Sequence, residues 1–220
     1  MIILPKKKND KYTISYSQIS LWNDKKSFNL GAKGYIEYIR KYFFGETYED
    51  PHGWAEFGRK VEDALEAGNF TGFTDSEIET LKKVKTFEVF QKDMFIDYGD
   101  FTLYGIIDNC TADLTKFKDF KTASKSSAKK YESEDYRQLS IYASATHKET
   151  GKLPVDVSVC VIERSGNPFR GEKLTVGGST WDIPKYITLD KVEEVDNYVV
   201  KTAEQISDCY KVFEKLNLVF

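Results

Sequence analysis

The segment FTLYGIIDNCTADLTKFKDFKT, residues 101–122, decides the fold of this 220-residue chain. It contains two short runs rich in aromatic and β-branched residues, 101–111 and 114–122, and a similar run precedes them at 86–97. Turn-forming Gly and Asp residues separate the three runs. Short runs of this composition between turns are typical of strands joined by hairpins. The sequence therefore predicts an antiparallel meander of three strands.

Apolar residues at helical spacing occupy much of the remaining chain. Before the meander the pattern predicts four helices, over residues 15–26, 33–43, 49–67 and 74–84. After it the pattern predicts a helix, an apolar strand, a Gly-rich loop or hairpin and a long helix, over residues 133–150, 155–163, 165–178 and 190–216. Gly68 and Gly151 are the expected helix stops, and Pro51 is expected in the first turn of its helix.

This order of elements predicts an α/β or α+β fold. Helices, meander, helix, strand and helix together suggest a central mixed β-sheet of about four or five strands flanked by helices. No repeat or low-complexity linker interrupts the chain, so we expect a single domain over residues 1–220. Its parts would be N-terminal helices at 15–85, a core at 86–163 and a C-terminal hairpin and helix at 164–220.

Composition excludes a disordered chain and a simple basic DNA-coating protein. Hydrophobic residues make up 40% and charged residues 30% of the chain, as in folded globular proteins. The formal net charge of −3 opposes general attraction to nucleic acid. It does not exclude a nuclease, because carboxylates that hold metal ions lower the net charge.

The three cysteines Cys110, Cys160 and Cys209 are widely spaced and form no CxxC pair. This spacing is a poor match for a zinc site, an iron–sulfur site or a disulfide framework, so we expect free thiols in a reducing compartment. No apolar run approaches the ~20 residues that a membrane helix needs, and the N-terminal apolar stretch is too short for a signal peptide. The expected location is the cytoplasm, without a membrane partner.

Three charged residues in the meander point to metal-dependent chemistry. Asp108 follows an apolar run, and Asp119 and Lys121 stand two apart on the next strand, so the latter two share one face. If the strands pair as a hairpin, Asp108 and Asp119 converge on a site suited to Mg²⁺ or Mn²⁺. A neighbouring Lys orients water or stabilises charge on a phosphate. The alternative is a set of surface residues with a weak ion pair.

The order of the motifs resembles a known nuclease family. G-x-x-D at 105–108, D-x-K-T at 119–122 and Q-x-x-x-Y at 138–142 resemble the RecB- and Cas4-like branch of the PD-(D/E)XK nuclease superfamily. Residues 15–22 resemble the opening helix of that branch, and 58–62 resemble a motif on a preceding helix. The resemblance covers residues 15 to 161 and implies a restriction-endonuclease-like core.

Carried over by position, the resemblance implies a specific metal site. Asp108 and Asp119 would be metal ligands, and Lys121 would be the catalytic lysine. Glu62 stands where the RecB and Cas4 pattern has His, and is similar to the Glu of phage exonucleases of the lambda type. It would be a third catalytic carboxylate and metal ligand, or alternatively a solvated helix residue. The implied cofactor is Mg²⁺, for which Mn²⁺ can substitute, and three cysteines are too few for the iron–sulfur cluster of Cas4- and AddB-like members.

Two further groups of residues are candidates for DNA binding. Gln138 and Tyr142 are four apart and share a helix face, where the resemblance implies that they meet DNA or brace the site. The alternative is an amphipathic helix with Tyr142 packed and Gln138 solvated. Lys125, Lys129 and Lys130 follow the D-x-K strand and are expected to bind backbone phosphates, or else to lie in a solvated loop or helix start.

The resemblance implies a Mg²⁺-dependent deoxyribonuclease, with an exonuclease in phage-type or bacterial recombination and repair as the preferred form. It would act on DNA in the cytoplasm of a bacterium or of a phage-infected cell. A homo-oligomer or a recombination partner protein stays open. One alternative is a catalytically silent nucleic-acid-binding or scaffold module of the same fold. Another is an unrelated α+β interaction protein in which the motifs are coincidental.

Overall fold

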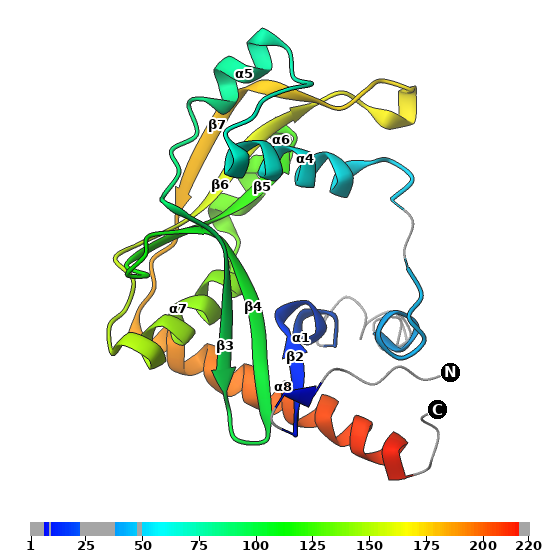
Figure 1. Cartoon of the computed structure of the whole chain (residues 1–220), viewed down its shortest axis with the longest axis vertical. Coiled ribbons are helices and arrows are strands. Elements are labelled where there is room, and N and C mark those ends of the chain that lie inside the picture. The colour runs from blue at the N-terminus through cyan, green and yellow to red at the C-terminus, as the bar shows by residue number, and fades with distance from the viewer. Residues whose placement is uncertain (1–6, 9, 23–37, 48–49, 216–220) are drawn as a thin grey trace. The chain divides into compact units, whose positions relative to one another are not determined.

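The computed structural model of the chain describes residues 7–8, 10–22, 38–47 and 50–215 (Figure 1). Its strands are β1 (Lys7–Lys8), β2 (Lys11–Ser15), β3 (Val89–Asp97), β4 (Phe101–Cys110), β5 (Lys116–Ala123), β6 (Asp156–Ser165) and β7 (Thr175–Pro184). Its α-helices are α1 (Tyr16–Trp22), α4 (Trp54–Ala67), α5 (Asp75–Leu81), α6 (Lys125–Ser133), α7 (Arg137–Thr150) and α8 (Leu189–Lys215). None of the helices in these ranges combines the length and apolar character needed to cross a bilayer.

The contacts divide the chain into two compact units of interleaved segments. The first unit contains residues 1–49, 93–106 and 190–220, and the second contains 50–92 and 107–189. Strands β3 and β4 run through both units, because the boundaries fall inside these strands. The single domain expected from the sequence stays a prediction.

The mixed α/β fold class is confirmed. The hydrogen-bonded order is β1-β2-β4-β5-β6-β7, with β3 paired to β4. Strand β5 pairs antiparallel to β4 and parallel to β6, and β6 pairs antiparallel to β7. The sheet has seven strands rather than the four or five that we expected. Strands β1 and β2 were not expected, and β7 begins inside the region predicted as a loop or hairpin.

Several helix boundaries differ from the sequence predictions. Residues 51–52 form a turn, so Pro51 is not in the first turn of α4, which begins at Trp54 after Gly53. Asp50 lies before the helix, and in this position Asp50 Oδ2 accepts from the Ala55 N–H at 2.5 Å. Gly68 ends α4 in the left-handed conformation that glycine tolerates, at φ 60°.

The helix predicted over 133–150 is α7, which begins at Arg137, and a separate helix, α6, precedes it. Ser124 caps α6 by accepting from the Ser127 N–H at 3.3 Å, and α6 ends at Glu134, whose backbone is extended. Of the helix predicted over 33–43, residues 33–37 lie outside the described residues, and Ile39–Phe43 form a π-helical turn. The final helix was predicted correctly as α8, within one residue at each end.

In the first unit, the core is aromatic and contains a small polar network. The hydroxyls of Tyr38 and Tyr210 lie 3.0 Å apart, and Gln18 Nε2 lies within 3.4 Å of each. Phe43 stacks on Tyr210 with ring centroids 4.8 Å apart. Strand β2 runs parallel to β4 in this unit, with Tyr12 opposite Phe101.

In the second unit, the core lies between the sheet and helices α4 and α5. Residues on both faces of β5 and β6 are buried, as expected for strands covered on each side. One cluster joins α4, α5, β5, β6 and β7 through Phe57, Val61, Leu65, Leu81, Phe120, Cys160, Ile162 and Val176. Helix α4 is therefore held against the strand that carries Asp119 and Lys121.

Helix α5 is fixed to β7 by one carboxylate. Glu77 Oε2 accepts from the Thr74 N–H at 2.7 Å, and the Thr74 hydroxyl accepts from the Glu77 N–H at 3.4 Å, which completes a capping box. Glu77 Oε1 accepts from the Val176 N–H at 2.9 Å. Burial alone would raise the pKa of Glu77, but the N–H groups of Thr74 and Val176 lower it below 4.5. The ionised form is thus favoured in the folded state.

Glu77→Gln is expected to lower the free energy of unfolding by about 1–3 kcal/mol at pH 7, because the amide cannot accept at both positions. Since the pKa of Glu77 is lower in the folded than in the unfolded protein, this contribution is complete above about pH 4.5. It is lost as the pH falls through the folded-state pKa. Urea titrations at pH 7 and pH 3 measure the difference, with Glu79→Gln on the exposed side of α5 as control. An equal cost at both pH values would contradict the prediction.

Candidate active site

The residues predicted to carry the chemistry all lie in the second unit. Glu62 is on α4, Asp108 on β4, and Asp119 and Lys121 on β5. Lys121 Nζ lies 2.5 Å from Asp119 Oδ2. Asp108 Oδ2 accepts from the backbone N–H of Phe120, the residue between the other two, at 2.9 Å. Glu62 interacts electrostatically with both Lys121 and Asp119.

Two buried polar side chains hold the strands beneath this group. Asn109 and Lys118 are register partners in the β4–β5 ladder. Asn109 directly follows Asp108, and Lys118 directly precedes Asp119. Since successive side chains alternate between the faces of a strand, Asn109 and Lys118 lie on the face opposite Asp108 and Asp119. This pair therefore holds the two strands together on the face opposite the site.

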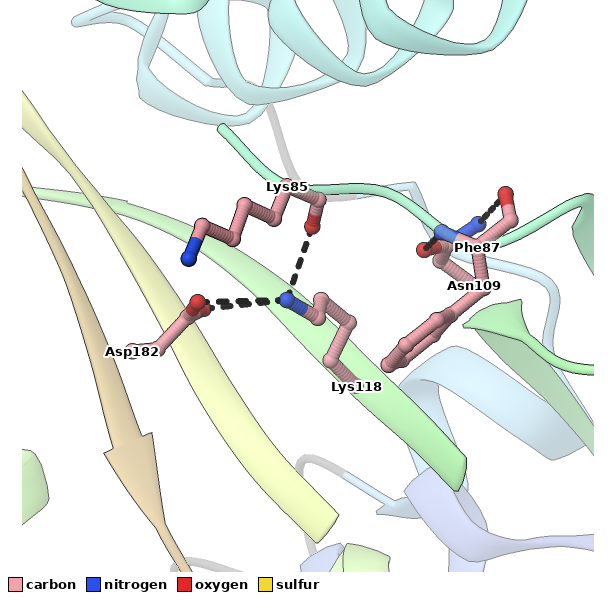
Figure 2. Close-up of polar contacts among 5 residues, drawn as sticks. All are labelled: Lys85, Phe87, Asn109, Lys118 and Asp182. Atoms are coloured by element: carbon pink, nitrogen blue, oxygen red, sulfur yellow. Dashed lines mark hydrogen bonds and ion pairs between the residues drawn. The ribbon is translucent and has the colours of Figure 1, made fainter. Parts of the chain in front are cut away.

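Figure 2 shows what these two side chains bind. Asn109 Oδ1 accepts from the Phe87 N–H at 2.7 Å, and its Nδ2 donates to the Phe87 carbonyl at 3.0 Å. Lys118 Nζ donates to the Lys85 carbonyl at 2.8 Å and lies 3.2 Å from Asp182 Oδ1. The segment before β3 and the strand β7 are thereby tied to β4 and β5. Because the polar atoms of Asn109 and Lys118 have partners, these hydrogen bonds fix the register of β4 and β5 that brings Asp108 and Asp119 together.

Asp119 is the most buried of the site residues, with 1% of its surface exposed. Its Oδ2 atom receives Lys121 at 2.5 Å and the hydroxyl of Tyr136, which donates at 3.0 Å. Its Oδ1 atom is buried and has no hydrogen-bond partner among the residues described. A buried carboxylate oxygen without a partner is costly in a protein interior unless a further donor or a cation satisfies it.

The electrostatics of the group follow from three carboxylates around one ammonium. Burial, followed by the charge of Asp119, raises the pKa of Asp108 to about 7. Burial would lower the pKa of Lys121, but Asp119 and Asp108 together raise it. Burial also raises the pKa of Glu62, against the opposing charge of Lys121. One lysine does not neutralise this cluster, so additional positive charge would stabilise it.

The carboxylate oxygens of the site are ligands of the kind that a hard divalent cation prefers. Mg²⁺ and Mn²⁺ prefer carboxylate oxygens, and Asp119 Oδ1 is such an oxygen without a partner. Within the described ranges, however, no three His, Cys, Asp or Glu side chains gather closely enough to form a metal site as they stand. In this structure Lys121 is the cation that contacts Asp119.

Sequence reasoning assigned no role to two tyrosines beside the group. Tyr136 donates to Asp119, and Tyr131 on α6 interacts electrostatically with Lys121 and Asp119. Their rings lie 5.9 Å apart in an edge-to-face arrangement. Tyr136 lies directly before helix α7, and Asp119 lies 17 residues earlier on β5. No rule of sequence spacing predicts a contact between two such positions. The only available signal was the position of Tyr136 between the two motifs.

The predicted DNA-binding residues are placed in two different settings. Gln138 Nε2 donates to the Tyr142 hydroxyl at 3.0 Å; Tyr142 is 4% exposed and Gln138 is half-buried. Lys125, Lys129 and Lys130 are exposed on α6, which packs beside β5 and β6. These lysines therefore lie on a helix that contacts the site strand.

Comparison with known proteins places the fold but not the family. No protein-family model matches the chain, and no curated protein matches it. Among solved structures, the chain is similar to one from Eubacterium rectale described as a "putative exonuclease", with a TM-score of 0.51 and 10% sequence identity. The similarity covers 88% of this chain and 79% of that one. At this identity the likeness shows a common fold.

Proposed function

We propose that this chain is a Mg²⁺-dependent DNA nuclease of the PD-(D/E)XK superfamily. One observation carries the proposal: Asp108, Asp119 and Lys121 gather in the second unit, and the buried Asp119 Oδ1 has no partner among the described residues. The order of the sequence motifs supports it. The likeness to a structure described as an exonuclease supports it independently.

The residues of the site divide the work of phosphodiester hydrolysis between them. A bound Mg²⁺ or Mn²⁺ ion supplies a Lewis acid that orients the phosphate and lowers the pKa of the attacking water. Asp108 and Asp119 would hold this ion, with Glu62 as a third carboxylate. The ammonium of Lys121 provides a fixed positive charge for the phosphate, whose negative charge grows during attack. The Tyr136 hydroxyl keeps the Asp119 carboxylate in place.

The preferred form of this activity is an exonuclease of phage-type or bacterial recombination and repair. Glu62 favours this form, because it stands at the position where phage exonucleases carry Glu rather than His. The structural neighbour is also described as an exonuclease. DNA is the proposed partner, and a homo-oligomer or a recombination protein would supply the positive surface that a chain of net charge −3 lacks.

A cleavage assay with matched DNA substrates tests this function. Linear and closed circular DNA, single- and double-stranded, would be incubated with Mg²⁺, Mn²⁺ or EDTA. We expect metal-dependent loss of the linear forms only, and no loss with Asp119→Ala. Asp156→Ala is the control, because Asp156 is an exposed carboxylate at the start of β6 in the same unit. It should cleave like the wild type.

Each other outcome selects a different function. Cutting of closed circles would indicate an endonuclease that uses the same site. Absence of cleavage under every metal condition, with a retained gel shift of DNA, would support a catalytically silent binding module. Absence of both would support an interaction protein in which the motifs are coincidental.

A further inference from the structure

The second unit carries a cluster of three aromatic side chains, two of them exposed, outside the proposed active site. His52, Trp54 and Phe169 form this aromatic platform. The His52 ring lies 4.2 Å from Phe169 and 4.9 Å from Trp54, and Trp54 lies 5.8 Å from Phe169. Phe169 is 70% exposed and Trp54 is 37% exposed. Single exposed aromatics are ordinary, whereas exposed aromatics that adjoin one another form the kind of contiguous patch found at binding surfaces.

The platform is built from two tightly turned segments. His52 and Trp54 flank Gly53, the N-cap residue of α4, and Trp54 is the first residue of that helix. Phe169 lies in the short 3₁₀ turn Pro168–Arg170 between β6 and β7. This hairpin requires Gly166, which has φ 92° and where a Cβ would lie 2.1 Å from the Lys173 carbonyl. The backbone that presents Phe169 is therefore constrained.

Charged side chains of both signs surround the platform. The guanidinium of Arg164 lies 5.2 Å from the centre of the Trp54 ring, within cation–π range. An adjoining groove of about 430 Å³ is lined by Lys60 and Lys173. Glu56 and Glu172 also line this groove, so the local field is mixed. Ring stacking, more than charge alone, must then account for any binding there.

Strand β6 connects the platform to the proposed active site within the same unit. Lys121 pairs with Val161 in the β5–β6 register, and Arg164 follows three residues later, on the order of 10 Å along the strand. Tyr131 interacts electrostatically with both Lys121 and Arg164. A chain of nucleotides with one phosphate at Lys121 would therefore reach the platform within a few nucleotides.

We propose that His52, Trp54 and Phe169 form a stacking platform for unpaired bases of single-stranded DNA next to the active site. This inference rests on the proposed nuclease function. Stacking requires exposed base faces, which a duplex does not offer, and aromatic rings with nearby Arg are the usual protein surface for such bases. Arg164, Lys60 and Lys173 complement the phosphates of that strand.

Binding without cleavage tests the platform directly. Fluorescence anisotropy in EDTA would compare an oligothymidylate of about a dozen nucleotides, an abasic oligomer of equal length and the matching duplex. We expect the oligothymidylate to bind most tightly. The double variant Trp54→Ala, Phe169→Ala should weaken its binding roughly 5- to 100-fold and leave the abasic oligomer nearly unchanged. Tyr186→Ala, which removes an 84% exposed aromatic of the same unit, is the control.

Phe169→Ala alone keeps the test valid if the double variant does not fold, because Phe169 is largely exposed. Equal affinity for the abasic oligomer and the oligothymidylate would overturn the platform. So would unchanged DNA binding together with loss of self-association in sedimentation, which would identify a protein interface. Base-dependent binding without any cleavage would refute the nuclease and keep the platform. Cleavage with binding unaffected by the variants would refute the platform alone.

Discussion

Lys121→Met is expected to lower the rate of metal-dependent DNA cleavage by roughly 10²- to 10³-fold, as removal of one preorganised charge does in other active sites. Lys121 Nζ lies 2.5 Å from the buried Asp119 and is the cation among three carboxylates. Met retains much of the apolar length of the side chain but carries no charge. Single-turnover cleavage of end-labelled linear DNA measures the loss.

The same variant separates catalysis from metal binding. Removal of the ammonium leaves Asp108, Asp119 and Glu62 without their positive neighbour, so Mg²⁺ should bind more tightly and raise the melting temperature further than in the wild type. Lys116→Met, at an exposed position of the same strand, is the control. Cleavage at the wild-type rate by Lys121→Met would remove this lysine from the mechanism.

Asp108→Asn is expected to raise the free energy of unfolding of the metal-free protein by about 1–3 kcal/mol at pH 8. The wild-type carboxylate is half-buried beside Asp119, and this neighbour together with burial raises its pKa. The neutral amide has the same shape, and its oxygen can still accept from the Phe120 N–H. The variant therefore loses the cost of burying a charge and the repulsion by Asp119, which outweigh the lost attraction to Lys121, and it keeps its hydrogen bond. Urea denaturation in EDTA measures the gain.

The effect of Mg²⁺ on the melting temperature should also differ between the wild type and Asp108→Asn. Mg²⁺ should raise the melting temperature of the wild-type protein, because it binds only the folded carboxylate cluster, and should not raise that of Asp108→Asn. Asp156→Asn, at an exposed position, should behave like the wild type. A destabilised Asp108→Asn with an intact Mg²⁺ response would show that Asp108 is a structural residue.

The parts of the fold that the sequence predicted depend on local patterns. The three runs at 86–122 became β3, β4 and β5, and α8 spans almost the predicted range. Asp108 and Asp119 could be placed together because they stand on consecutive strands with a short turn between them. Alternation along β5 then put Lys121 on the same face as Asp119.

The missed elements depend on contacts between distant residues. Strand β2 pairs parallel to β4, with Tyr12 opposite Phe101, and no local pattern indicates such a partner. The end of α6 has a similar cause. No Gly or Pro marks it, but Lys185 Nζ donates to the Glu134 carbonyl at 2.8 Å and also to that of Tyr131. The contact between Tyr136 and Asp119 is likewise tertiary.

The interleaved units set an order of events during translation. The first unit joins residues that are far apart in the sequence, since Gln18 contacts Tyr210, which is synthesised 192 residues later. The second unit is complete in the nascent chain once residue 189 has left the ribosome. Domains usually fold from the N-terminus during synthesis, but here β2 and α1 must wait for α8. Ile14 and Ile19, which are fully buried in the finished protein, would meanwhile be open to chaperones.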